Sequence, residues 1–206
     1  MGLLAVKGTA GRFGRGRLLL MVAACLSVLT GGIVRAGGEE KMPAPRFASF
    51  LARMLTYDTN LKKRAGERLT IAVLYQGKDA VSVAEGFELA AALKNLELVK
   101  ILDLPVATLG VALTDAAMLE KAVRSHGIDV FVVSGGLHNQ TALIKKISEK
   151  GKILTIGTSS DQVRVGLSIA AYLDNGKSKL MVNLPASKSE GVAFGGELLG
   201  LAEVIQ

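Results

Sequence analysis

Two histidines, His126 and His138, are the only imidazoles in the 206-residue chain. A hydrolytic site needs a nucleophile, a base and an orienting group within reach of one another. His126 precedes Gly127 at a predicted helix end, where a polar residue near the last carbonyls is ordinary. His138 follows a glycine-containing turn after a predicted strand, so it is the better placed of the two for a ligand contact; the plainer interpretation is a solvated residue at the start of a helix.

Other catalytic and metal-binding patterns are missing from the sequence. The only cysteine, Cys25, lies in an apolar segment, so the rest of the chain has no thiolate nucleophile, disulfide or cysteine-based zinc site. The carboxylates show no metal-ligand spacing, and no glycine-rich stretch forms a phosphate loop. We therefore expect no catalytic set, no metal and no cofactor. Hydrolysis that depends on His138 is the remaining enzymatic alternative.

Polar residues that could meet a ligand or a partner follow three predicted strands. The carboxyl ends of parallel strands meet at one edge of a sheet, where α/β proteins bind ligands. Asp161, in the third loop, would either cap a helix or face the ligand. The candidate contact residues are Tyr75, Gln76 and Lys78 in the first loop, Ser134, Gly135, Gly136 and His138 in the second, and Thr158, Ser159 and Asp161 in the third.

The elements that must position these loops alternate between helix and strand. Short, apolar, β-branched runs predict strands at 69–75, 99–104 (ended by Pro105), 128–133 and 152–156. Apolar residues at helical spacing predict helices that open at Pro43, with Phe47, Leu51, Met54 and Leu55 on one face, and over 83–96, with Phe87, Leu89, Ala90 and Leu93 inward. Further helices are predicted over 116–125, capped by Asp115, and over 139–150, and a loop is predicted over 62–66.

The pattern changes in the C-terminal part of the chain. Asn175-Gly176 lies between two alternating runs, 166–173 and 178–184, and this dipeptide is a strong hairpin signal. An amphipathic helix is predicted over 195–205. The chain is thus predicted to be an α/β protein, with a mostly parallel sheet, helices on both faces and a C-terminal antiparallel hairpin edge.

The basic charge of the chain is concentrated at its start. Of the 25 lysines and arginines, five lie in the first 36 residues, where no acidic residue occurs. The remaining 20 basic and 18 acidic residues nearly cancel, so the net charge of +7 indicates targeting and no nucleic-acid partner.

These first 36 residues have the order of a secretory signal: a basic start, the apolar run 18–29, and small residues before a predicted cut after Ala36. Lipidation at Cys25 and an uncleaved anchor remain open as alternatives. All three place the rest of the chain outside the cytoplasm. We expect a signal segment, residues 1–36, and one α/β domain, residues 37–206.

The last third of the chain carries four features in a characteristic order. They are the turn from Thr155 to Asp161, the hairpin 167–184 that ends in Asn183-Leu184, the small-residue turn 186–191, and the segment LLGLA at 198–202. In these features the chain resembles the YfiR/HmsC-like family of periplasmic regulators. The opening segment FASFLARMLTYD is also similar. The sequence departs from the family in lacking cysteines after residue 36 and in having Tyr57-Asp58 where many members carry Trp-Pro.

The resemblance implies a periplasmic domain, often a homodimer, that restrains a membrane-bound diguanylate cyclase. We therefore expect a regulator or sensor that binds a membrane signalling partner, such as a diguanylate cyclase or a histidine kinase. The alternative is a periplasmic small-molecule binding protein that resembles one lobe of a solute-binding protein.

Overall fold

The computed structural model describes residues 38–206. The predicted signal segment, its cut after Ala36 and the alternative lipidation site Cys25 lie outside these residues. Within 38–206, none of the helices combines the length and the apolarity that crossing a membrane requires.

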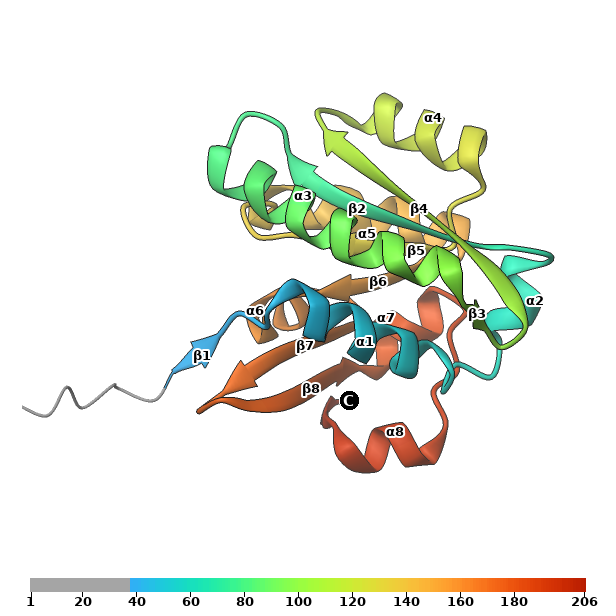
Figure 1. Ribbon diagram of the computed structural model, residues 1–206, viewed down its shortest axis with the longest axis vertical. Coiled ribbons are helices and arrows are strands. Elements are labelled where there is room, and N and C mark those ends of the chain that lie inside the picture. The colour runs from blue at the N-terminus through green and yellow to red at the C-terminus, as the bar shows by residue number, and fades with distance from the viewer. Residues whose placement is uncertain (1–37) are drawn as a thin grey trace, which may run out of the picture. The chain divides into compact units, whose positions relative to one another are not determined.

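One twisted sheet of nine strands forms the centre of the described fold (Figure 1). Its order is β3-β4-β2-β5-β6-β7-β8-β9, and β1 pairs with β7. Strands β4, β2, β5, β6 and β7 run parallel, whereas β8 is antiparallel to β7 and β9 is parallel to β8. The strands are β1 Glu39–Glu40, β2 Leu69–Gln76, β3 Lys100–Ile101, β4 Leu104–Leu113, β5 Val130–Val133, β6 Leu154–Gly157, β7 Ile169–Asp174, β8 Lys177–Asn183 and β9 Glu203–Ile205.

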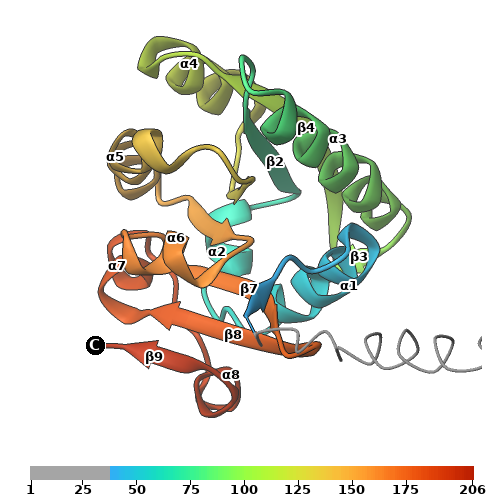
Figure 2. The same ribbon diagram turned by 90° about the vertical axis from the view of Figure 1, so that its left-hand side faces the viewer.

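Helices cover both faces of the sheet, α1 and α3 on one side and α4 and α5 on the other (Figure 2). This arrangement confirms the predicted α/β class. The α-helices are α1 Ala44–Leu55, α2 Leu61–Ala65, α3 Ala80–Lys94, α4 Ala116–His126, α5 Thr141–Gly151, α6 Ser160–Arg164, α7 Leu184–Ser189 and α8 Gly196–Leu201, and the 3-10 turns are η1 Asn95–Leu98 and η2 His138–Gln140.

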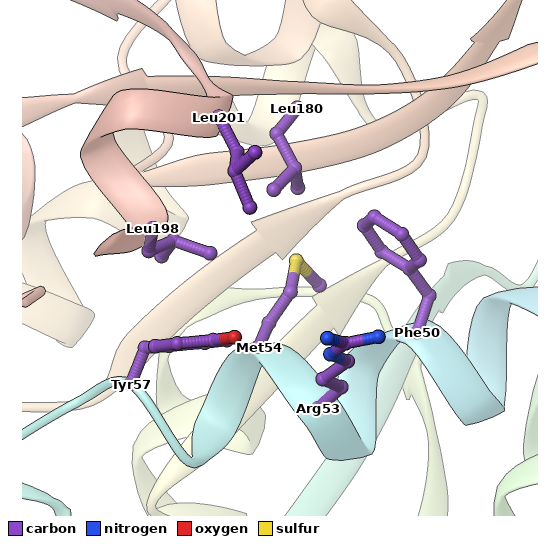
Figure 3. A pocket seen from close by; sticks show the side chains of 7 residues that line it. All are labelled: Phe50, Arg53, Met54, Tyr57, Leu180, Leu198 and Leu201. Carbon is purple, nitrogen blue, oxygen red and sulfur yellow. The ribbon is translucent and has the colours of Figure 1, made fainter.

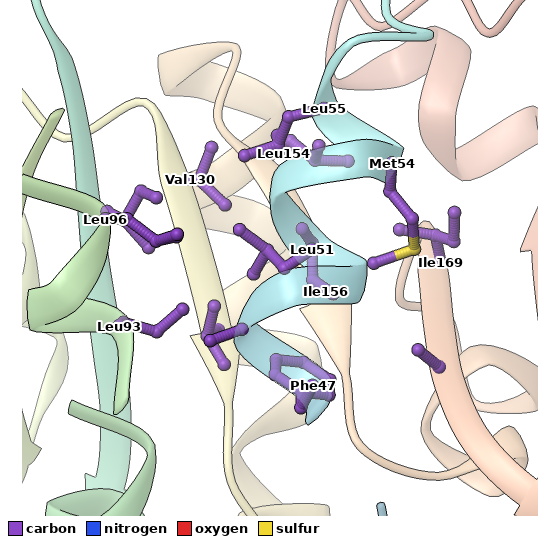
Figure 4. Close-up of a cluster of buried hydrophobic side chains, with 14 of the residues drawn as sticks. Phe47, Leu51, Met54, Leu55, Leu93, Leu96, Val130, Leu154, Ile156 and Ile169 are labelled. Atoms are coloured by element: carbon purple, nitrogen blue, oxygen red, sulfur yellow. The ribbon is translucent and has the colours of Figure 1, made fainter. Parts of the chain in front are cut away.

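The core consists of two main apolar clusters that share the central strands. Alternate residues of a strand point to opposite faces: in β2, Ile71 and Val73 join the cluster under α1 and α3, and Ala72 and Leu74 join the cluster under α4 and α5. Figure 4 shows the first cluster around Leu51 of α1. Buried strands of this kind have continuous apolar sequences, as the run 69–75 has.

The predicted strand over 99–104 was wrong. Residues 100–101 form the short β3, and the ten-residue β4 begins at Leu104 and continues through Pro105. Leu102 and Asp103, both with positive φ, form the two-residue turn between them. Pro105 is tolerated because it is the second residue of β4 and precedes Val106, the first residue of β4 that pairs with β2.

Three further predictions need correction. Residues 61–65 form α2 instead of a loop. The predicted helix over 195–205 is split into α8 and β9, because residues 203–205 pair with β8. Phe87 is 61 % exposed and does not point inward, whereas Leu89 and Leu93 are buried as predicted. The Asn175-Gly176 hairpin is confirmed, and both residues have positive φ.

Candidate functional site

A polar cleft lies at the carboxyl ends of β5 and β6. Its volume is about 350 Å³. We call it the polar cleft. Its walls come from β1 and the residue after it, from α3 and from the loops that follow β5 and β6: Glu39, Glu40, Lys41, Glu85, Gly135, Thr158, Ser159 and Asp161.

Glu85 of α3 joins the three walls of the cleft. Its side chain is 6 % exposed. Gly135 N–H donates to Glu85 Oε2 at 2.9 Å, and Thr158 Oγ1 donates to Glu85 Oε1 at 3.1 Å. Lys41 Nζ lies 3.2 Å from Glu85 Oε2. The carboxylate therefore fixes the position of both loops and holds the only cationic side chain among the lining residues.

Ser82, one turn before Glu85, links the loops that follow β2 and β5. The Gln76 N–H donates to Ser82 Oγ at 2.9 Å, and this hydroxyl donates to the carbonyl of Gly135 at 2.6 Å. Ser134 Oγ lies 3.0 Å from the same hydroxyl. Asp79 caps α3 by accepting from the N–H groups of residues 81 and 82. Ser82 thus joins the backbone of residue 76 to that of residue 135 beneath the cleft.

The loop after β6 is held by the start of α6. Ser159 is the N-cap residue and forms a capping box with Gln162. Gln162 Nε2 donates to the carbonyls of Val133 and Ser134, at 3.0 and 3.1 Å, and so ties this loop to the end of β5. Asp161 lies in the first turn of α6 and does not cap it.

The residues just after the predicted signal segment close one side of the cleft. We call residues 39–41 the N-terminal strap. Glu39 and Glu40 pair with Asp174 and Leu173 of β7. The Glu39 carboxylate accepts from the N–H of Ser160 at 2.7 Å and from its hydroxyl. The next residue, Met42, is 2 % exposed and anchors the strap in the core.

The structure brings together four of the ten residues predicted to form the site. Gly135, Thr158, Ser159 and Asp161 line the polar cleft, and Ser134 is fully buried beneath it.

The other five predicted residues do not line the cleft. Gln76 takes part through its backbone only. The ring of Tyr75 packs against Phe87, with centroids 5.6 Å apart. Lys78, Gly136 and His138 are exposed. The first loop therefore supports the cleft and does not form its wall.

Glu85 and the N-terminal strap were not predicted from the sequence. Glu85 did leave a signal, because it lies on the buried stripe of α3, three residues after Ser82 and four before Leu89. A charged residue in that position needs a buried partner.

In residues 38–206, no three histidine, cysteine, aspartate or glutamate side chains come together in a way that could hold a metal ion.

A second depression, which we call the apolar pocket, lies between α1, β8 and α8. Its volume is about 140 Å³, and the lining side chains converge on it from both sides (Figure 3). Leu201 at its edge is 72 % exposed. The lining residues are Phe50, Arg53, Met54, Tyr57, Leu180, Leu198 and Leu201.

Three solved structures with a similar fold illustrate the likeness. The ABC domain in complex with L-Trp from Streptococcus pneumonia is 16% identical, with a TM-score of 0.56, over 79% of this chain and 60% of that one. A conserved domain protein from Vibrio cholerae is 13% identical, with a TM-score of 0.56, over 81% and 61%. The substrate-binding protein CD0873 from Clostridium difficile is 17% identical, with a TM-score of 0.51, over 71% and 57%.

The chain therefore spans about 60% of the length of the first two structures. Identities this low show a shared fold alone. Among curated proteins, none matches the sequence.

The YfiR/HmsC-like family model, by contrast, matches residues 47–203, which is most of the chain and nearly all of the described fold. This match supports a periplasmic regulator rather than an enzyme. The chain belongs to the YfiR/HmsC-like family.

Proposed function

We propose that this chain is exported by its first 36 residues and acts in the periplasm as a regulator that binds a membrane-bound signalling protein, such as a diguanylate cyclase or a histidine kinase. The observation that carries the proposal is the family match over residues 47–203. The apolar pocket supports it, because a pocket lined by aromatic and aliphatic side chains is the kind of surface that holds an anchor residue of a protein partner.

Copurification from membranes tests the proposal. We expect the tagged protein to recover a cyclase or a kinase. Leu201→Asp places a charge at the edge of the apolar pocket and is expected to reduce recovery about tenfold, which corresponds to the loss of one moderate contact residue. Leu98→Asp is the matched control, because Leu98 is 85 % exposed in η1 and does not line the pocket.

Equal loss of recovery in the two variants would argue against the pocket as the contact surface. Recovery of no membrane signalling protein by the unaltered chain would contradict the regulator proposal itself. A homodimer, which the family likeness implies, is tested separately by the mass in solution.

Small-molecule binding in the polar cleft is the second candidate function. It is favoured by the position of the cleft at the ends of β5 and β6, where ligands of α/β sheets bind. Of the similar folds, one is described in complex with L-Trp and another as a substrate-binding protein. A screen of metabolites by thermal unfolding tests this function, because a ligand that binds only the folded chain raises its midpoint.

A further inference from the structure

The ion pair between Glu85 and Lys41 joins a buried side chain to a solvent-exposed one. Glu85 is 6 % exposed, whereas Lys41 is 47 % exposed. A carboxylate removed from water needs compensation by hydrogen bonds and by an opposite charge. The bonds from Gly135 and Thr158 orient Glu85 but leave its charge to be balanced by the one ammonium group in the cleft.

The element that supplies this ammonium group has few attachments. The N-terminal strap pairs with β7 through two residues only, and Glu39 adds its contacts with Ser160. Gly135 and Thr158, in contrast, belong to loops that are tied to each other by Gln162. The acceptor side of the ion pair is thus rigid, and the donor side is held by a short segment at the edge of the fold.

The charge of the cleft favours cations. Four of its eight lining residues are acidic and one is basic. If the Lys41 ammonium left its place, the cleft would keep a buried, oriented carboxylate with further carboxylates around it. Such a site attracts a compact cation that can donate several hydrogen bonds, which is what a primary ammonium group does.

We propose that Glu85 is the recognition group for ligands that carry a primary amine, and that Lys41 occupies this position as a tethered competitor until a ligand displaces it. The inference rests on the second candidate function and specifies its ligand class. Met42, buried next to Lys41, limits the displacement to the strap itself.

The attachment of Lys41 to the N-terminal strap sets how strongly it weakens the binding of a free amine. A group held on a short flexible segment competes at an effective concentration in the millimolar range. A free amine must overcome this competition, so the unaltered protein binds simple amines weakly. Removal of the Lys41 ammonium should tighten amine binding at least about tenfold.

Calorimetric titration with cadaverine (1,5-diaminopentane) at low ionic strength tests the proposal. The titration uses protein purified from its own host, in the form that remains after any processing there. We expect Lys41→Ala to bind cadaverine at least about tenfold more tightly than the unaltered protein. Lys62→Ala is the matched control, because it removes the same charge from an exposed ion pair with Asp103, 2.9 Å long, and it should leave the affinity unchanged. Glutarate, the dianion of the same length, should not bind any of these proteins.

Glu85→Gln provides a second readout, since the amide oxygen can still accept from Gly135. In the Lys41→Ala background it should abolish cadaverine binding. Equal cadaverine affinity in Lys41→Ala and Lys62→Ala, with unfolding midpoints like that of the unaltered protein, would overturn the proposal. If another metabolite then raised the unfolding midpoint of the protein, the second candidate function would stand without the proposal of amine recognition by Glu85. If no compound stabilised any variant, that function would fail too.

Discussion

Glu190, just after α7, is the most heavily hydrogen-bonded carboxylate in the interior. It is 1 % exposed. It accepts from Ser148 Oγ of α5, from the N–H and hydroxyl of Thr155 in β6, and from the hydroxyl of Ser168. Burial raises the pKa of Glu190, and these hydrogen bonds offset part of the rise. One side chain therefore joins a helix, a strand and the segment before β7.

Substitutions of Glu190 should show how much this network stabilises the fold. Glu190→Ala leaves several buried donors without an acceptor, and we expect it to lower the free energy of unfolding by about 3 kcal/mol or more. Glu190→Gln keeps one acceptor oxygen and should cost about 1–2 kcal/mol. Urea unfolding measures both. Glu149→Ala, on the outer part of α5, serves as the control, and an equal loss in the control would contradict the argument.

Asp129, just before β5, predicts a dependence of stability on pH. Burial raises the pKa of Asp129 from 3.8 to about 6, against the lowering effects of its bond from Thr70 N–H and of nearby arginines. Between these two values the folded state keeps a proton that the unfolded chain has released. Stability from this group is therefore greatest below pH 3.8 and is lost as the pH rises to about 6.

Asp129→Asn should remove this contribution, because the amide has no charge to bury and can still accept from Thr70. The expected gain in the free energy of unfolding above pH 6 is about 1–2 kcal/mol, less than the full pKa difference would give, because Asp129 is only half-buried and solvent screens its charge. There should be little gain at pH 3.5. Denaturation at a series of pH values provides the measurement. A gain that does not change with pH would show that titration of Asp129 is not its cause.

At the scale of elements, Gly86 allows α3 to lie directly on β2. A Cβ atom at this position would lie 2.6 Å from Tyr75 Cβ, closer than any relaxed contact. We expect Gly86→Ala to lower the free energy of unfolding by about 1–3 kcal/mol through overpacking, although alanine is the better helix former. Gly200→Ala in α8, where nothing lies within 4 Å, should be neutral or slightly stabilising. Thermal unfolding distinguishes the two cases.

The elements that the sequence predicted best are those with strong local signals. The hairpin at Asn175-Gly176 has a dipeptide suited to two positive φ angles. The turn at Leu102-Asp103 has the same backbone form but a residue pair that gives no such signal, so β4 was missed. The split of the C-terminal segment into α8 and β9 was also unpredictable locally, because pairing with β8 decides it.

The candidate site was predicted only in part, because local sequence signals identify its loops but not the tertiary contacts that complete it. The loops after β5 and β6 follow clear apolar strands, and topology alone brings Gly135 and Thr158 together. Glu85 approaches them only because α3 crosses the same face, and Lys41 approaches because β1 pairs with β7, far along the chain. Contacts of this kind depend on tertiary packing and leave little trace in local periodicity.

At the scale of the whole molecule, the two main apolar clusters share β2 and β5 and should therefore unfold together. Leu51→Ala in α1 and Leu119→Ala in α4 each truncate a fully buried side chain, one in each cluster. We expect each to shift a single cooperative transition by about 2–5 kcal/mol. Circular dichroism during urea unfolding provides the measurement, and two separate transitions would contradict a shared core.

The ring of Tyr57 in the wall of the apolar pocket also has a spectroscopic consequence. The chain contains no tryptophan. A Tyr57→Trp substitution would place the only indole of the protein beside Met54 and Leu198, on the surface where we propose that the partner docks. Its fluorescence would respond to the loss of water from this surface, and the protein could report the arrival of its partner without an attached dye.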